Sequence, residues 1–345
     1  MARHSMQRLR SARSRTALCG LRGLCVTRRL VGLAFVVLLG SVRAAAAQDT
    51  HLLVITGVEG DAEHGDQFYK WATALIDAAR KKGGLTDANV TFLADKVERD
   101  PAKIRGRSTS ENVRKAFADL AEHARPSDEV FIVLFGHGSY DGRVAAFNLP
   151  GPDLSVADYG KLLDKIRSAR VVFVNTASSS GEFAKGLAGP GRTIVTATRT
   201  GGERNETRFP PYFVEAFTGD AADRDRNGRI SVAEAFEYSK AKVQQEFERG
   251  GYVLSEHATL EEGGTGAAGA LYLESERARA ADIASVANPA LRAALEQKRE
   301  LEDQVAGLRL RKASMPADQY DQELEKLVTA LAQKTRAIQQ LEGKK

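Results

Sequence analysis

Cysteine is almost absent from this 345-residue sequence. The chain has two cysteines, Cys19 and Cys25, and none after residue 25. The chain beyond that point therefore has no thiol for a disulfide, for thiolate metal ligation or for a cysteine nucleophile. Negative charge is missing from residues 1–47, which contain nine arginines and no aspartate or glutamate.

Long apolar runs are scarce as well. The run Leu30–Leu39 is too short for a comfortable membrane span, and small residues up to Ala47 follow it. A basic start, a short apolar stretch and an A-x-A site predict a signal peptide, residues 1–47, and export to the periplasm or the cell exterior. The triplet 27–29 (TRR) also allows a twin-arginine route, and a retained anchor is the alternative interpretation.

The net positive charge of the chain comes from residues 1–47. Removing their nine arginines from the whole-chain formal charge of +5 leaves −4. A chain with that balance has no basic footprint for nucleic acid. We therefore expect no nucleic-acid partner and no stable membrane span after cleavage.

Residues 48–262 show apolar runs that alternate with amphipathic helical patterns. Val/Ile-rich strands alternating with helices are typical of a mostly parallel sheet covered on both faces. The sequence thus predicts a three-layer α/β sandwich. The expected strands are 51–56, 89–93, 130–135, 170–175 and 193–198, and the expected helices include 67–81, 110–124, 155–166 and 182–187.

The C-terminal part differs in composition. Residues 263–289 begin with a glycine-rich stretch and are expected to form a flexible linker. Residues 290–345 are rich in Leu, Ala, Glu, Lys and Arg with apolar positions three and four apart, and Pro316 interrupts them. This pattern predicts an antiparallel, coiled-coil-like helical hairpin. Its apolar seams could face each other, the main domain or another subunit, and it could mediate protein interaction.

Two strand ends carry the chemistry-bearing residues. His137-Gly138 follows the strand 130–135, and 41 positions after His137, Ser178 lies within Ala177–Gly181 (ASSSG), which follows the next strand. This arrangement resembles the legumain-like cysteine peptidases of the caspase–hemoglobinase fold, whose H-G and A-C-x-[SG]-G motifs end neighbouring parallel strands. The similarity covers roughly residues 51–251. It implies a caspase-like sandwich, endopeptidase ancestry and a peptide or protein ligand.

The sequence departs from that family at the nucleophile. Ser178 stands where the family has its catalytic cysteine, and serine needs a well-placed base to lose its proton. In the family the histidine mainly protonates the leaving group. We therefore expect His137 and Ser178 to form a degenerate site that binds peptides with little or no proteolysis. The alternatives are a working Ser178–His137 endopeptidase and a likeness of fold alone.

The surroundings of this site offer few further signals. Gly138, Arg199 and Glu203 are candidate pocket residues because they follow neighbouring strands, although a solvated loop would have the same charges. Asp141 is either a carboxylate that orients His137 or part of an Asp-Gly turn. The glycines at 57 and 60 do not fit a dinucleotide motif and indicate a turn.

The segment Asp223–Glu234 (DRDRNGRISVAE) matches a 12-residue EF-hand loop, with helical patterns on both sides. It predicts a Ca²⁺ site that staples the adjoining helices together. A capped helix start is the alternative. Because three arginines make the loop formally neutral, we expect modest affinity, roughly 10⁻⁴ to 10⁻³ M. The expected ligands are Asp223, Asp225, Asn227, Arg229 through its backbone carbonyl, Ser231 and Glu234.

Overall fold

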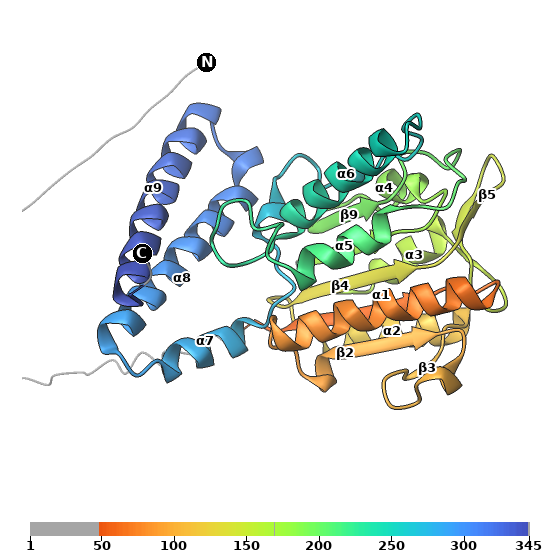
Figure 1. Ribbon diagram of the computed structural model, residues 1–345, viewed down its shortest axis with the longest axis horizontal. Coiled ribbons are helices and arrows are strands. Elements are labelled where there is room, and N and C mark those ends of the chain that lie inside the picture. The colour runs from red at the N-terminus through yellow and green to blue at the C-terminus, as the bar shows by residue number, and fades with distance from the viewer. Residues whose placement is uncertain (1–47, 169, 344–345) are drawn as a thin grey trace, which may run out of the picture. The chain divides into compact units, whose positions relative to one another are not determined.

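The computed structural model describes residues 48–168 and 170–343 (Figure 1). The signal peptide expected over residues 1–47 lies outside the described residues. Among the helices that are described, none is both long and apolar enough to cross a membrane.

A seven-stranded sheet organises the α/β part, in the order β10-β9-β8-β4-β1-β2-β3. All neighbouring strands are parallel except β10, which runs antiparallel to β9 at one edge. The predicted class, an α/β fold with a mostly parallel sheet, is confirmed. The strands are β1 (Thr50–Thr56), β2 (Val90–Ala94), β3 (Gly106–Arg107), β4 (Glu129–Phe135), β8 (Arg170–Asn175), β9 (Arg192–Thr196) and β10 (Thr259–Glu261).

Alternate side chains of the central strands enter two separate apolar cores. On β4, Phe131 and Val133 join the core beneath α1, α5 and α6, whereas Ile132 and Leu134 join the core beneath α2, α3 and α4. Burial on both faces explains why these strands are continuous apolar runs. The helices are α1 (Ala62–Lys81), α2 (Ser110–His123), α3 (Val156–Leu163), α4 (Gly181–Leu187), α5 (Phe209–Thr218) and α6 (Val232–Arg249), with short 3₁₀ helices η1 (Asp87–Asn89) and η2 (Val97–Arg99).

A second, three-stranded antiparallel sheet was not predicted. It consists of β5 (Gly138–Tyr140), β6 (Ala145–Phe147) and β7 (Leu154–Ser155), which pair in that order. Strands of two or three residues carry too little periodicity to be recognised in a sequence. This sheet matters for the site because β5 begins directly after His137.

The C-terminal part packs as a helical hairpin, as predicted. The helices α8 (Pro289–Leu310) and α9 (Ala317–Leu341) run antiparallel (Figure 1), joined through η4 (Lys312–Ser314). Leu308 and Ile338 are buried in this part. The expected linker, by contrast, contains the 3₁₀ helix η3 (Ala267–Ala270) and the helix α7 (Glu276–Ser285), whose first turn is capped by the Ser275 side chain. This helix was not predicted, because a single capping serine after a glycine-rich stretch is a weak signal, and the flexibility of residues 263–289 stays a prediction.

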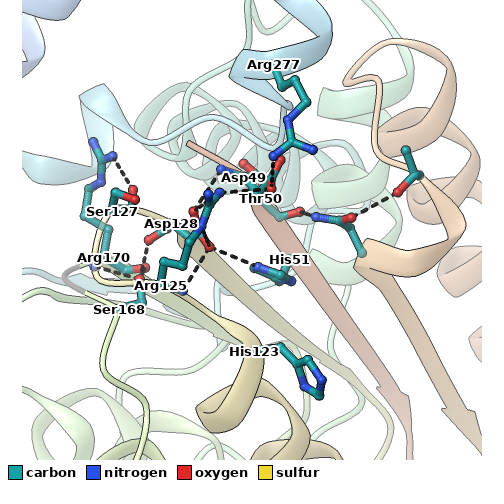
Figure 2. A network of polar contacts seen from close by, with 12 residues as sticks. Asp49, Thr50, His51, His123, Arg125, Ser127, Asp128, Ser168, Arg170 and Arg277 are labelled. Carbon is teal, nitrogen blue, oxygen red and sulfur yellow. Dashed lines mark hydrogen bonds and ion pairs between the residues drawn. The ribbon is translucent and has the colours of Figure 1, made fainter. Parts of the chain in front are cut away.

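The amino ends of β1 and β4 are tied together by a network of charged groups (Figure 2). Asp128 accepts hydrogen bonds from the backbone N–H of Asp49 at 3.0 Å and from the backbone and guanidinium of Arg125 at 2.9 to 3.1 Å. Arg277 of α7 joins the network through Asp49 at 2.8 Å. Burial favours the neutral acid, but these hydrogen bonds outweigh it and lower the pKa of Asp128 to about 2.

Candidate functional site

The carboxyl ends of β4 and β8 bring the two predicted catalytic residues to one edge of the sheet. The strands are parallel neighbours, with Leu134 paired to Asn175. His137 lies two residues beyond β4, and Ser178 lies three residues beyond β8. Polar residues at this edge of an open α/β sheet are in the usual place for ligands and chemistry.

Ser178 is held against the strand that follows the histidine. Its hydroxyl donates to the carbonyl oxygen of Gly138 at 3.3 Å. A Cβ atom at position 138 would lie 2.2 Å from the carbonyl oxygen of Ser178, so the two backbones touch here and only glycine fits. Gly138, a predicted pocket residue, contacts Ser178 through its backbone.

The other two serines of the turn have structural roles. Ser179 is buried with φ = +55°, a left-handed conformation that non-glycine residues rarely adopt, and its N–H donates to the carbonyl oxygen of Glu203 at 2.8 Å. The Ser180 hydroxyl is buried at 3.2 Å from the Thr198 hydroxyl. A strained backbone conformation persists only where the surrounding structure fixes it, and such residues cluster at functional sites.

His137 contacts a second histidine and not Ser178. Its ring lies 4.8 Å from that of His64 and 5.2 Å from that of Phe68, measured between centroids. Burial of the imidazole, with a smaller effect from the His64 charge, lowers the pKa of His137 below its ordinary value. None of the hydrogen bonds of the described residues joins His137 to Ser178, so the hydroxyl has no imidazole base within bonding reach.

His64 is the residue that the sequence analysis missed. It lies in the first turn of α1, and its Nδ1 is 2.8 Å from an Asp61 carboxyl oxygen, while its Nε2 is 3.6 Å from Glu206. The hydrogen bond with Asp61 raises the pKa of His64. The available signal was the position of the 57–60 turn, which follows β1 and so opens onto the same edge of the sheet as His137.

The predicted pocket residues Arg199 and Glu203 do not form a common pocket with Ser178. The backbone carbonyl of Glu203 accepts from the N–H of Ser179 at 2.8 Å and its carboxylate accepts from the backbone N–H of His257 at 2.9 Å, so this residue braces the serine turn. The exposed Arg199 lines a cavity of about 300 Å³ whose lining includes neither His137 nor Ser178. Asp141 accepts from the backbone N–H of Arg143 at 2.8 Å. This bond fits the interpretation of Asp141 as part of a turn.

The loop 223–234 brings three of its expected ligands together. One carboxylate oxygen from each of Asp223, Asp225 and Glu234 lies within 4.8 Å of the others. Partial burial and then the Glu234 charge raise the pKa of Asp225 to about 6. Gly228 turns the chain with φ = +86°. Oxygen donors crowded in this way suit a hard cation such as Ca²⁺ or Mg²⁺, so the donor set fits the predicted group.

The other predicted ligands of the loop hold its shape. The Asn227 side chain donates to Asp225 at 3.0 Å and accepts from the N–H of Arg229 at 2.7 Å. Ser231 caps α6 in a reciprocal pair with Glu234, which is the capped helix start named as the alternative to metal binding. The helix cap and the carboxylate cluster coexist, because Glu234 uses Oε2 for the cap and Oε1 for the loop amides.

No protein-family model matches this chain, and a comparison with curated proteins gives no match.

Proposed function

We propose that this protein is an exported, calcium-stabilised homologue of legumain-like peptidases that binds peptide or protein segments and has lost efficient proteolysis. The strand-end positions of His137 and Ser178 support the resemblance. The helices on both faces of the mostly parallel sheet are compatible with a caspase-like sandwich.

One observation carries the proposal that catalysis is lost. The Ser178 hydroxyl donates to the Gly138 carbonyl, and the imidazole of His137 packs against His64 and Phe68. A serine without a base within about 3.2 Å has no route for its proton, whereas a cysteine is partly ionised at neutral pH. The strand-end turns of a nucleophile site are thus kept, and an oxygen atom of Ser178 replaces the sulfur of the family's cysteine.

The test compares the native protein with Ser178→Ala and Ser178→Cys against a diverse peptide library, with product analysis by mass spectrometry. We expect the native protein to retain a subset of peptides uncleaved and Ser178→Cys to cleave members of that subset. Cleavage by the native protein that Ser178→Ala abolishes would establish the alternative, a serine endopeptidase. A native protein that neither retains nor cleaves peptides would leave only a likeness of fold.

The calcium part of the proposal rests on the convergence of Asp223, Asp225 and Glu234. The sequence-based expectation of low calcium affinity included the positive charge of Arg229. In the structure this guanidinium is paired with glutamates outside the loop. We expect about 5 mM Ca²⁺ to raise Tm by about 2 to 4 °C, as a ligand near tenfold above its Kd should. Glu234→Gln should abolish this gain, and Glu237→Gln, an exposed glutamate of the same helix, should preserve it. An unchanged native Tm would refute the site.

A further inference from the structure

The side chain of Arg229, at position 7 of the loop, points away from the loop and is buried. Its guanidinium carbon lies 3.6 Å from the ring centroid of Tyr272, and Nε and Nη2 bind the carboxylates of Glu274 and Glu276 at 2.7 and 2.8 Å. These partners lie between η3 and the start of α7. The loop exit also forms an antiparallel bridge, Ser231 to Tyr272. One wall of the loop is therefore bound to the segment that leads into the hairpin.

The helix α8 completes this enclosure. Nη1 of Arg229 lies 3.6 Å from Glu302, whose side chain is 5% exposed. Nζ of Lys298, one turn earlier, donates to the backbone carbonyl of Asn227 at 2.6 Å and lies 3.5 Å from Glu302. Two residues of the hairpin thus hold the main chain at loop position 5 and the side chain at position 7.

These contacts act on the part of the loop whose main chain would ligate the ion. Position 7 offers its backbone carbonyl, and a clamped Arg229 side chain restricts the dihedral angles that aim this carbonyl. A loop ordered in advance loses less conformational freedom on binding, which raises affinity. The hairpin would thus contribute to calcium binding without touching the ion.

We infer that the C-terminal hairpin sets the calcium affinity of the loop, with Lys298 and Glu302 as positioning residues. The inference rests on the proposed calcium site. Because coupling between two binding events is reciprocal, calcium in turn strengthens the docking of α8 on the α/β part. A single loop is stabilised here by a helical hairpin of the same chain.

The test measures Ca²⁺ affinity by isothermal titration calorimetry for the native protein, Glu302→Gln and Lys298→Gln. We expect each variant to bind about tenfold more weakly, within the usual range of coupling between sites. The two variants change the local charge in opposite directions. Electrostatics alone would weaken binding in Glu302→Gln and tighten it in Lys298→Gln, whereas loss of positioning weakens both. Glu300→Gln, an exposed residue of the same helix, is the matched control and should bind as the native protein does.

Hydrogen exchange supplies the reciprocal measurement. Calcium should slow exchange across residues 289–341 in the native protein and have a smaller effect in Lys298→Gln. Because the Lys298 side chain is partly exposed, this variant should fold, and it keeps the test valid if Glu302→Gln does not. Native-like affinity in both variants, or tighter binding in Lys298→Gln, would overturn the coupling and leave the calcium site intact. A native protein that binds no calcium would overturn the site and the inference together.

Discussion

The two ends of the parallel sheet are built in opposite ways. At the amino end, Asp128 is 1% exposed and all its hydrogen-bonding capacity is directed to Arg125, His51 and the backbone (Figure 2). At the carboxyl end, Ser178 is half-buried, with one hydrogen bond at 3.3 Å, beside the left-handed Ser179. The same strands therefore have one end closed by paired charges and one end where a half-buried hydroxyl with a single long hydrogen bond lies beside a strained residue.

This difference separates stability from function. Charges that are buried and fully paired make a folded structure costly to open, because breaking such a pair leaves an uncompensated charge. A half-buried side chain with a single long hydrogen bond, such as that of Ser178, contributes little to stability and remains available for a ligand. The comparison predicts that the amino end contributes more to stability than the carboxyl end, where we propose that ligands bind, and measurements at each end test it.

The largest effect is expected from Asp128→Ala. The substitution removes a buried carboxylate that accepts hydrogen bonds from two backbone N–H groups and from the Arg125 guanidinium, and it should lower the free energy of unfolding by about 3 kcal/mol. Urea unfolding monitored by circular dichroism gives the value. Ser178→Ala should cost less than about 1 kcal/mol, and Asp119→Ala, which removes an exposed ion pair with Lys115, less than about 0.5 kcal/mol. Equal losses for Asp128→Ala and Ser178→Ala would remove the distinction between the two ends.

Gly138→Ala tests whether the backbone contact between β5 and the serine turn is sterically tight. The added Cβ would lie 2.2 Å from the Ser178 carbonyl oxygen. Separating β5 from the serine turn to relieve this contact should lower the free energy of unfolding by about 2 to 3 kcal/mol. Gly307→Ala, in open space within α8, should instead raise it by about 0.5 to 1 kcal/mol. A neutral Gly138→Ala variant would show that the turn can move away.

Glu129, next to Asp128, should make the amino end sensitive to rising pH. Burial raises the pKa of Glu129 to about 7, partly offset by Arg170. A raised pKa means that the folded state keeps its proton longer, so this contribution to stability is complete below about pH 4.5 and is lost as the pH rises through about 7. Glu129→Gln should match the native protein at pH 4 and exceed it by about 2 kcal/mol at pH 8. Parallel curves for the two proteins would contradict the assignment, and the exposed Glu111→Gln provides the baseline.

Much of the fold could be predicted because the central strands are buried on both faces. Val130–Phe135 and Val171–Val174 are apolar at every position, which only a covered parallel sheet requires. The short strands β5 to β7 and the helix α7 could not be predicted. Their residues have little periodicity, and pairing with distant segments or a single capping serine decides their structure.

The site was predicted in position but not in its bonds. Parallel strands end at one edge, so a strand–turn pattern is sufficient to bring His137 and Ser178 to the same region. Whether the Ser178 hydroxyl bonds to an imidazole or to a carbonyl depends on the geometry of both turns, which local sequence does not encode. The contact of His137 with His64 joins residues 73 positions apart, which no local pattern encodes.

For this chain the sequence by itself determined the parallel α/β sheet, the edge where polar residues gather, the absence of a thiol in the described part and the acidic loop 223–234 ahead of a capped helix. These follow from local periodicity, residue chemistry and fixed spacing. Only the tertiary structure decided that Ser178 bonds to Gly138, that Glu203 braces the turn and that Arg229 joins the loop to the hairpin. Those contacts link residues distant in the chain, and their geometry depends on how the elements pack.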